Sequence, residues 1–319
     1  MTAPRIQRSI RTEGAAGIGA WYAAPGYDPR VIDLPNHPND TVPAEASHLV
    51  LELSVAIDAA RAAARIQVER YEHLEQIVKK SEKDVVTEVD HLSEEIIIAT
   101  VRRTFPDDPF LAEESGHSGP KRGAVPADGA GASAAVDADH RLWIVDPLDG
   151  TVNYANGIPH FCVSVALVIG GQPAVGVVLD PLRDDLYSAL RDGGASLAGT
   201  PIRVPERVLG DAVISLALPQ SRFARREGRI RKAVRVPRSM GSAALGLAWV
   251  ANGRFDAFIQ AGGLSLWDIA AAGLIAQEAG AIVTDGGGGP WFDLTRRTRA
   301  SGIVAATPAN HAALMELLR

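Results

Sequence analysis

Apolar residues recur at helical spacing in two stretches of the first hundred residues. In the segment 47–74, charged residues separate the apolar positions. This spacing predicts one long helix, whose buried face is made of Leu49, Leu53, Ala56, Ile57, Ala60 and Ala64. A second helix is predicted from Glu88 to Arg103, with a buried face made of Val89, Leu92, Ile96 and Val101.

Short apolar runs follow, at 142–145, 161–169, 174–179 and 212–217. Their length is that of buried strands, and Gly170-Gly171-Gln172 between the second and third runs predicts an antiparallel hairpin. Further along, the pattern predicts helices within 241–253, 267–280 and 310–319, alternating with strands at 256–260, 281–285 and 301–308. Helices interleaved with hairpins predict a layered α/β sandwich.

Two segments show no periodicity. Residues 1–43 are rich in glycine, alanine and proline, and we expect an extension with little regular structure. Residues 116–140 have a similar composition and predict a loop inserted between ordered elements. The rest, 44–319, is expected to form one domain with lobes of about 44–206 and 207–319.

The composition is that of a soluble folded protein, with 46% hydrophobic and 22% charged residues. The net charge of −6 argues against a dedicated nucleic-acid binder, and no apolar run has the length of a membrane-spanning helix. Cys162 is the only cysteine, which excludes an internal disulfide. We therefore expect a reducing, cytoplasmic location and interpret Cys162 as a core residue.

Two acids end the apolar run at 142–145, in the segment Asp146-Pro-Leu-Asp149-Gly-Thr. Buried charge that nothing compensates is unfavourable, so a cation is expected between them. Oxygen ligands of this kind suit Mg²⁺, and two such ions about 3.5–4 Å apart can hold both oxygens of a phosphoryl displacement.

Three other acidic segments have simpler interpretations. Thr87…Asp90 and Ser265…Asp268 both match a capping box, a hydroxyl followed three residues later by an acid at the start of a helix. The pair Glu113-Glu114 is compatible with exposed loop charges. These interpretations do not explain why a predicted strand delivers Asp146 and Asp149 to one place.

The chain resembles the inositol monophosphatase family in two long motifs and three shorter ones. The long motifs are Trp-Ile-Val-Asp-Pro-Leu-Asp-Gly-Thr-Val-Asn-Tyr-Ala-Asn at 143–156 and Trp-Asp-Ile-Ala-Ala-Ala-Gly-Leu-Ile-Ala-Gln-Glu-Ala-Gly-Ala at 267–281. The shorter ones lie at 83–90, 112–115 and 238–258, with Ala112 at a position where the family usually has glycine. The resemblance covers about 45–319.

The resemblance implies a set of roles. Ligands of two or three Mg²⁺ ions would be Glu113, Asp146, the Leu148 carbonyl, Asp149 and Asp268, with Asp146 bridging. The water nucleophile would be oriented by Asp90 and Thr151, with Glu114 beside it. The substrate would contact Asp149, the backbone at Gly150 and Thr151, Ala243 and Gln260.

The resemblance also implies a fold and an activity. The fold would be a five-layer α/β/α/β/α sandwich of the inositol monophosphatase and fructose-1,6-bisphosphatase type, usually a homodimer. The activity would be Mg²⁺-dependent, lithium-sensitive hydrolysis of a small phosphate monoester such as inositol 1-phosphate by metal-activated water. Histidinol phosphate, fructose 1,6-bisphosphate and nucleotide 3′-phosphates are alternatives, because Gln260 stands where inositol-specific members have glutamate.

Three features carry other hypotheses. A haloacid-dehalogenase mechanism would need a second aspartate two residues after Asp146, where the chain has Leu148. Asp-Gly-Gly-Gly-Gly-Pro at 285–290 lacks the Lys-Ser/Thr of a phosphate-binding loop, and a turn is favoured. The arginines of 221–239 suggest a regulatory or nucleic-acid-associated scaffold, but a solvated basic face or subunit edge is favoured; family analogy places this segment near the rim of the site.

Overall fold

The computed structural model describes residues 46–319 except 75–76, 82–83, 120–139, 219 and 297–298. The predicted extension 1–43 lies outside the described residues. The helices are α1 (Val50–Arg70), α2 (Glu88–Arg102), α3 (Thr151–Ala155), α4 (Gln220–Ala233), α5 (Ala243–Ala248), α6 (Leu266–Glu278) and α7 (Pro308–Leu318), with short 3₁₀ turns at Ala46–Leu49 and Leu209–Asp211. No described helix combines the length and apolarity needed to cross a bilayer.

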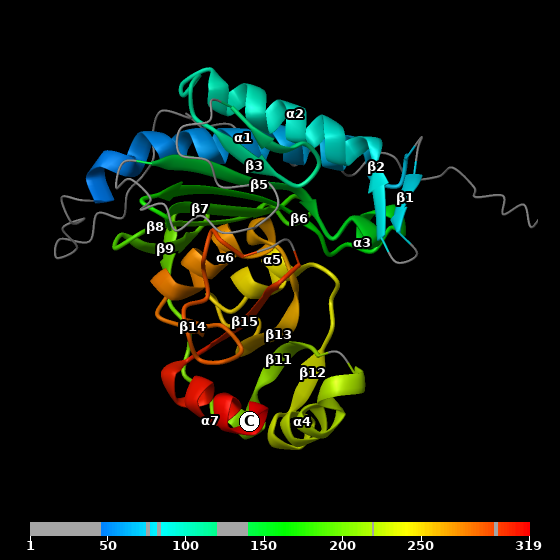
Figure 1. Cartoon of the computed structure of the whole chain (residues 1–319), viewed down its shortest axis with the longest axis vertical. Coiled ribbons are helices and arrows are strands. Elements are labelled where there is room, and N and C mark those ends of the chain that lie inside the picture. The colour runs from blue at the N-terminus through cyan, green and yellow to red at the C-terminus, as the bar shows by residue number, and fades with distance from the viewer. Residues whose placement is uncertain (1–45, 75–76, 82–83, 120–139, 219, 297–298) are drawn as a thin grey trace, which may run out of the picture. The chain divides into compact units, whose positions relative to one another are not determined.

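The described strands form three sheets (Figure 1). A hairpin pairs β1 (Ile77–Ser81) with β2 (Asp84–Thr87). The eight-stranded sheet has the order β10-β9-β8-β7-β6-β5-β3-β4, and it contains β3 (Phe110–Ala112), β4 (Gly116–Ser118), β5 (Arg141–Asp149), β6 (Cys162–Ile169), β7 (Gln172–Asp180), β8 (Asp185–Leu190), β9 (Gly194–Leu197) and β10 (Thr200–Ile202). The five-stranded sheet has the order β12-β11-β13-β15-β14, and it contains β11 (Val213–Ala217), β12 (Val236–Arg238), β13 (Ala257–Leu264), β14 (Ile282–Thr284) and β15 (Ser301–Ala306).

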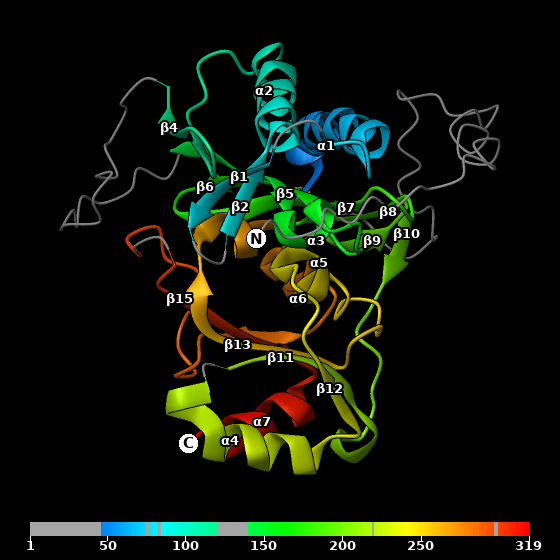
Figure 2. The same ribbon diagram turned by 90° about the vertical axis from the view of Figure 1, so that its right-hand side faces the viewer.

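Helices and sheets alternate in five layers (Figures 1 and 2). Helices α1 and α2 cover one face of the large sheet, where Ala56, Ile97 and Val145 share one apolar cluster. Helices α5 and α6 fill the space between the two sheets, and α4 and α7 cover the outer face of the small sheet. The predicted layered α/β sandwich is therefore confirmed, whereas the two lobe boundaries stay a prediction.

Helix α6 is apolar on nearly all sides because both sheets bury it; its segment Ile269–Ala276 is buried throughout. Its backbone approaches β7 so closely that a Cβ on Gly176 would lie 2.7 Å from the carbonyl oxygen of Ala271. A side chain at Gly176 would therefore displace α6, whose N-terminal turn carries Asp268.

The structure corrects two predictions in the first half of the chain. Leu92 is 37% exposed, whereas Ile97 is fully buried, because α2 turns Val89, Ser93 and Ile97 toward the interior. The predicted loop 116–140 begins with an ordered strand, since β4 pairs antiparallel with β3; residues 120–139 lie outside the described residues. The hairpin predicted around Gly170-Gly171-Gln172 is confirmed by the antiparallel pairing of β6 and β7.

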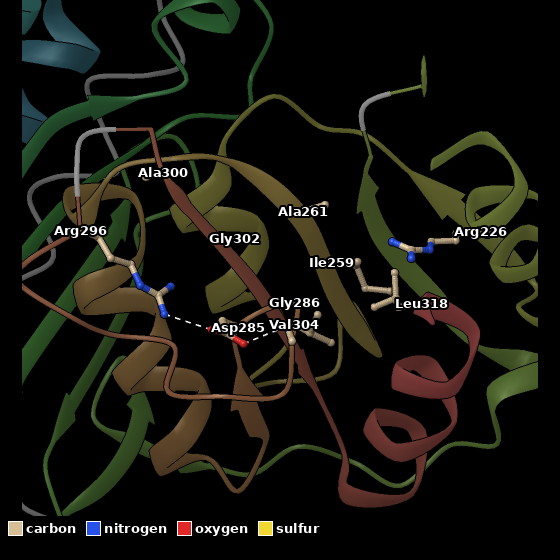
Figure 3. Close-up of a pocket in the computed structure, with 11 residues that line it drawn as sticks. Arg226, Ile259, Ala261, Asp285, Gly286, Arg296, Ala300, Gly302, Val304 and Leu318 are labelled. Carbon is tan, nitrogen blue, oxygen red and sulfur yellow. Dashed lines mark hydrogen bonds and ion pairs between the residues drawn. The ribbon is translucent and has the colours of Figure 1, made fainter. Parts of the chain in front are cut away.

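The basic segment also differs from expectation. Ile230 of α4 and Val234, which directly follows the helix, are buried against the outer face of the small sheet, whereas α5 and α6 lie on the other face. Placing this helix at the rim of the acidic site is therefore wrong. Arg225 and Arg229 are exposed, and Arg226 lines a cavity on the outer face (Figure 3).

Candidate active site

Asp146 and Asp149 lie on the same side of β5 because the strand contains a bulge. Three residues apart in a regular strand, they would point to opposite faces of the sheet. The pairing with β6 matches Asp146 to Ser164 and Asp149 to Cys162, so three steps on β5 oppose two on β6. Pro147 sits in this bulge, a position that suits a residue without an N–H donor.

Asp268 joins these two acids from the first turn of α6. One of its oxygens, Oδ2, accepts the backbone N–H of Ser265 at 2.6 Å, which forms half of a capping box. Ligand oxygens of Asp146, Asp149 and Asp268 all lie within 4.8 Å of one another. The capping box and a metal-ligand role are therefore compatible at Asp268.

Burial and neighbouring negative charges raise the pKa of both Asp146 and Asp268. Burial raises the pKa of Asp146 well above its ordinary value of 3.8, and the charges of Glu113, Asp149 and Asp268 add to the effect. Burial and the charge of Asp149 likewise raise the pKa of Asp268 well above the ordinary value. A cation among these carboxylates would relieve both effects, since opposite charge favours the ionised form.

Asp149 is fixed by the start of α5. Its Oδ2 accepts the Ser242 hydroxyl at 2.5 Å and the Ala244 N–H at 2.6 Å, and the backbone of Ala243 adds a further hydrogen bond. These bonds lower the pKa of Asp149, but burial outweighs them and the net shift is upward. Sequence reasoning missed Ser242, although its position before Ala243–Ala248 matches an N-cap.

Asp90 and Thr151 meet beside the acids. Thr151 Oγ donates to Asp90 Oδ1 at 2.9 Å, while Asp90 Oδ2 accepts the N–H of Thr87 at 2.8 Å and its hydroxyl at 2.7 Å. The capping box predicted at Thr87 and Asp90 is thus present together with the contact to Thr151. Burial raises the pKa of Asp90, and the charge of Glu114 contributes to the rise.

The turn that carries Glu113 and Glu114 follows β3. The N–H of Glu113 donates to the carbonyl of Val145, the residue before Asp146, at 3.2 Å. Buried Glu94 on α2 accepts the N–H groups of Glu114 and Ser115, each at 2.9 Å. Sequence reasoning missed Glu94, although it lies four residues after Asp90 and therefore on the same helix face.

Of the remaining predicted residues, Gly150 and Leu148 belong to the turn that carries Asp149, whereas Gln260 lies apart from the acids in its contacts. Gly150 has a φ of 96°, and a Cβ there would lie 3.0 Å from the His160 carbonyl oxygen, so the turn into α3 requires glycine. The Leu148 carbonyl accepts the Thr151 hydroxyl at 2.9 Å. Gln260, by contrast, donates back to the carbonyl of Gly262 at 3.3 Å, and no described contact joins it to the acids.

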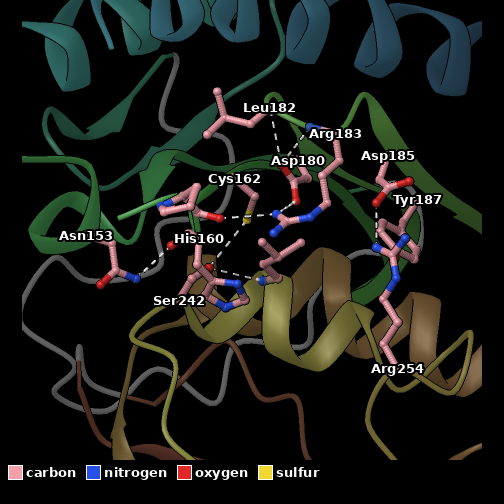
Figure 4. Close-up of polar contacts among 12 residues, drawn as sticks. Asn153, His160, Cys162, Asp180, Leu182, Arg183, Asp185, Tyr187, Ser242 and Arg254 are labelled. Carbon is pink, nitrogen blue, oxygen red and sulfur yellow. Dashed lines mark hydrogen bonds and ion pairs between the residues drawn. The ribbon is translucent and has the colours of Figure 1, made fainter. Parts of the chain in front are cut away.

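Cys162 is fully buried, as the core interpretation predicted, and Figure 4 shows its side chain near Ser242. Its sulfur lies 3.8 Å from both Asp149 Oδ2 and Ser242 Oγ. Burial and the nearby acids raise its pKa well above 9, so the thiol stays protonated. Asn153 closes this side of the site by donating to the carbonyls of His160 and Met240, both at 2.7 Å.

The match to the model of the inositol monophosphatase family extends over residues 50–319. The chain belongs to this family. It is 40% identical over 266 residues to the Nus factor SuhB of Pasteurella multocida, a match that covers 80% of this chain and 91% of the relative. It is 35% identical to inositol monophosphatase 1 of Solanum lycopersicum, covering 84% of this chain and 94% of the relative.

A solved structure shares the fold. The IMPase of Thermotoga maritima superposes with a TM-score of 0.70 at 30% identity and covers 84% of this chain and 96% of its own. The predicted inositol monophosphatase-type fold is thereby confirmed. The acidic cluster lies within the matched region, on β5 and on the first turn of α6.

Proposed function

We propose that the protein is a Mg²⁺-dependent phosphatase of small phosphate monoesters, with inositol 1-phosphate as the first candidate substrate. The observation that carries the proposal is the cluster of Asp146, Asp149 and Asp268, whose oxygens lie within 4.8 Å of one another. The same cluster lies next to Asp90 and Thr151, a carboxylate and a hydroxyl already joined by a hydrogen bond.

The donor set fits Mg²⁺ because it consists of oxygens alone. Glu113, Asp146 and the Leu148 carbonyl would hold one ion, and Asp146, Asp149 and Asp268 would hold another. The family resemblance allows for a third ion. Bound Mg²⁺ would offset the repulsion among the acids, make a water more acidic and stabilise charge on the phosphate.

Asp90 and Thr151 would orient the attacking water. The Thr151 hydroxyl donates to Asp90 or to the Leu148 carbonyl, so its oxygen lone pairs are left to accept a hydrogen bond from the attacking water. Asp90 can take up a proton because burial raises its pKa. Glu114 would assist through its charge, which favours the protonated form of Asp90.

Substrate contacts would come from both lobes. The backbone N–H groups of Gly150 and Thr151 would bind the phosphate, and Asp149, Ala243 and Gln260 would contact the rest of the ester. The tomato relative named inositol monophosphatase 1 favours an inositol phosphate. Histidinol phosphate, fructose 1,6-bisphosphate and nucleotide 3′-phosphates remain the alternatives, since Gln260 is a neutral amide.

The test is hydrolysis of these esters by purified protein with Mg²⁺ or with EDTA. We expect the protein to hydrolyse the ester with Mg²⁺ but not with EDTA, and we expect Li⁺ to inhibit this turnover. The Asp146→Asn variant should show no turnover. Full turnover in EDTA would overturn the proposal, and the preferred ester would identify the substrate. Gel filtration and cell fractionation would test the homodimer and the cytoplasmic location that we also propose.

A second candidate function comes from the relatives named Nus factor SuhB, one of them 40% identical. On this hypothesis the chain acts as a Nus factor whether or not it hydrolyses an ester. The exposed arginines of α4, among them Arg225 and Arg229, would be available to a partner. Replacing the chromosomal gene with Asp146→Asn separates the two: rescue of the deletion phenotype favours this role, and failure favours the phosphatase.

A further inference from the structure

Two sequence motifs that the phosphatase does not use meet at a second cavity. The arginine cluster contributes Arg226 from α4, and the glycine run contributes Asp285 to Gly287 after β14. Arg296, in the segment before β15, completes the wall of a cavity of about 380 Å³ (Figure 3). Both motifs, each without a role of its own, therefore belong to one concave site.

The cavity is separate from the acidic cluster. Successive residues of a strand point to opposite faces, so Ile259 and Ala261 of β13 line the cavity while Gln260 points to the other side of the sheet. Ile259 and Val304 belong to the apolar cluster shared with α4 and α7. The acids lie on the other side, beside α5 and α6.

Asp285 organises the glycine turn. Its Oδ1 accepts the N–H groups of Gly287 at 2.9 Å and Gly289 at 2.8 Å, and its Oδ2 accepts Arg296 Nη2 at 3.1 Å. The carboxylate is therefore held by three donors and its charge is paired with that of Arg296. Arg226 brings a second guanidinium group to the opposite wall of the cavity.

Both guanidinium groups are held in place. Arg296 Nη2 donates to the carbonyl of Pro290 at 2.7 Å as well as to Asp285, and Arg226 Nη2 donates to the backbone oxygen of Arg319 at 3.2 Å. Both of these bonds of Arg296 come from Nη2. A planar guanidinium with five donors is suited to bidentate recognition of phosphate or carboxylate.

The floor between the arginines is apolar. Ile259, Val304 and Leu318 line it, so inorganic ions alone would leave this surface uncovered. We infer that this cavity is a second ligand site, which takes a small organic anion that carries a phosphate or carboxylate group on an apolar body. Its volume is that of a small-molecule site.

The experiment uses full-length protein stripped of divalent metal. Without metal the acids at the phosphatase site repel anions, so binding reports the second cavity whether or not the protein hydrolyses esters. Calorimetric titration with phenyl phosphate, benzoate and inorganic phosphate should show one saturable site. Phenyl phosphate should bind about tenfold more tightly than inorganic phosphate, since its ring covers the apolar floor. The tighter of phenyl phosphate and benzoate identifies the preferred oxyanion.

Two variants test the location. Arg226→Gln should weaken binding of phenyl phosphate by about tenfold through the lost charge-assisted bonds. Ala261→Leu should weaken it by filling the cavity while keeping every charge. Arg229→Gln, at an exposed position on the same helix, is the matched control and should bind as wild type does. Absence of saturable binding, or one affinity shared by all four proteins, would overturn the inference.

Discussion

The hydroxyl of Thr151 lies 2.9 Å from Asp90 Oδ1 and also 2.9 Å from the carbonyl oxygen of Leu148. Since a hydroxyl carries one proton, it can donate to only one of these acceptors at a time. The contact joins the first turn of α3 to the first turn of α2, although the two residues are 61 positions apart in the sequence. It links the proposed proton acceptor to the turn that directly follows Asp149.

The first prediction concerns this pair. Thr151→Ala should lower kcat by about a hundredfold or more and change KM little, because the hydroxyl would act on the water and not on the bound ester. Thr151→Ser keeps the hydroxyl and should retain most of the turnover. Steady-state kinetics on the preferred ester measures both. A rise in KM that matched the fall in kcat would instead assign Thr151 to substrate binding.

The second prediction concerns stability of the metal-free protein. The folded-state pKa of Asp146 and that of Asp268 lie well above the ordinary 3.8. The folded form therefore keeps protons that the unfolded chain has lost, and the free energy of unfolding falls as pH rises from about 4 through the raised values. In EDTA at pH 7.5, Asp146→Asn should be more stable than wild type by about 1 kcal/mol or more.

Urea unfolding of both proteins at pH 4 and pH 7.5, with EDTA or Mg²⁺, measures this effect. The difference between variant and wild type cancels the contributions of other titrating groups. The advantage of Asp146→Asn should disappear at pH 4, where wild-type Asp146 is also protonated, and it should shrink when Mg²⁺ is added. A variant less stable than wild type in EDTA at pH 7.5 would mean that the charge of Asp146 supports the fold.

The third prediction concerns His160, which is 3% exposed and packs edge-on against Trp249 with ring centroids 4.9 Å apart. Neither ring nitrogen has a hydrogen-bond partner among the described residues. Burial lowers the pKa of His160 to about 4, and the charge of Arg183 adds to the effect. Between pH 6.5 and pH 4 the unfolded chain therefore binds a proton at His160 that the folded state does not bind. The free energy of unfolding falls as pH drops below 6.5, and this loss is complete near pH 4.

Between pH 7.5 and pH 5 this histidine should remove about 2 kcal/mol of the free energy of unfolding. His160→Phe keeps an aromatic ring against Trp249 and should remove that part of the pH dependence. His91→Gln, at an exposed position of α2, is the control and should keep the wild-type dependence. If the free energy of unfolding changed with pH in the same way for His160→Phe and wild type, other titrating groups would be responsible for the pH dependence.

Much of this architecture could be predicted from the sequence because its elements have strong local signals. The hairpin of β6 and β7 follows from two apolar runs around Gly170-Gly171, and α6 follows from a long apolar helix that ends before Gly280. The sequence prediction turns Leu92 inward and is wrong there, because periodicity sets the spacing of a helix face but not its direction. Contact with the large sheet decides that direction and buries Ile97 instead.

The site shows the same division. The segment from Asp146 to Asp149 could be recognised as acidic and strand-terminal, but only the bulge at Pro147 puts both side chains on one side. The contacts of Glu94 and Ser242 depend on how separate elements pack, so no local pattern specifies their partners. The second cavity is even harder to predict from the sequence, since Arg226 and Asp285 come from two motifs that are unrelated in sequence and meet only in the folded protein.

The last prediction concerns Gly150, where conformation and space both require glycine. Its φ is 96°, and an added Cβ would lie 3.0 Å from the His160 carbonyl oxygen, 3.2 Å from Ser242 Cβ and 3.3 Å from Phe161 Cα. Two of these three atoms belong to the backbone and cannot turn aside. Gly199 has a φ of 79° with no atom within 4 Å of its Cβ position, so it shares the conformation without the crowding.

Comparison of Gly150→Ala with Gly199→Ala therefore separates the two effects. Left-handed backbone alone costs about 1–2 kcal/mol for a residue with a Cβ, and crowding in a packed site adds about 1–3 kcal/mol. Gly199→Ala should lose only the first amount and keep wild-type turnover. Gly150→Ala should lose both amounts, and its turnover should fall sharply because the displaced turn carries Thr151 away from Asp90. Equal losses of stability, measured by urea unfolding, would mean that the β5–α3 turn shifts freely and that its tight packing does not position the site.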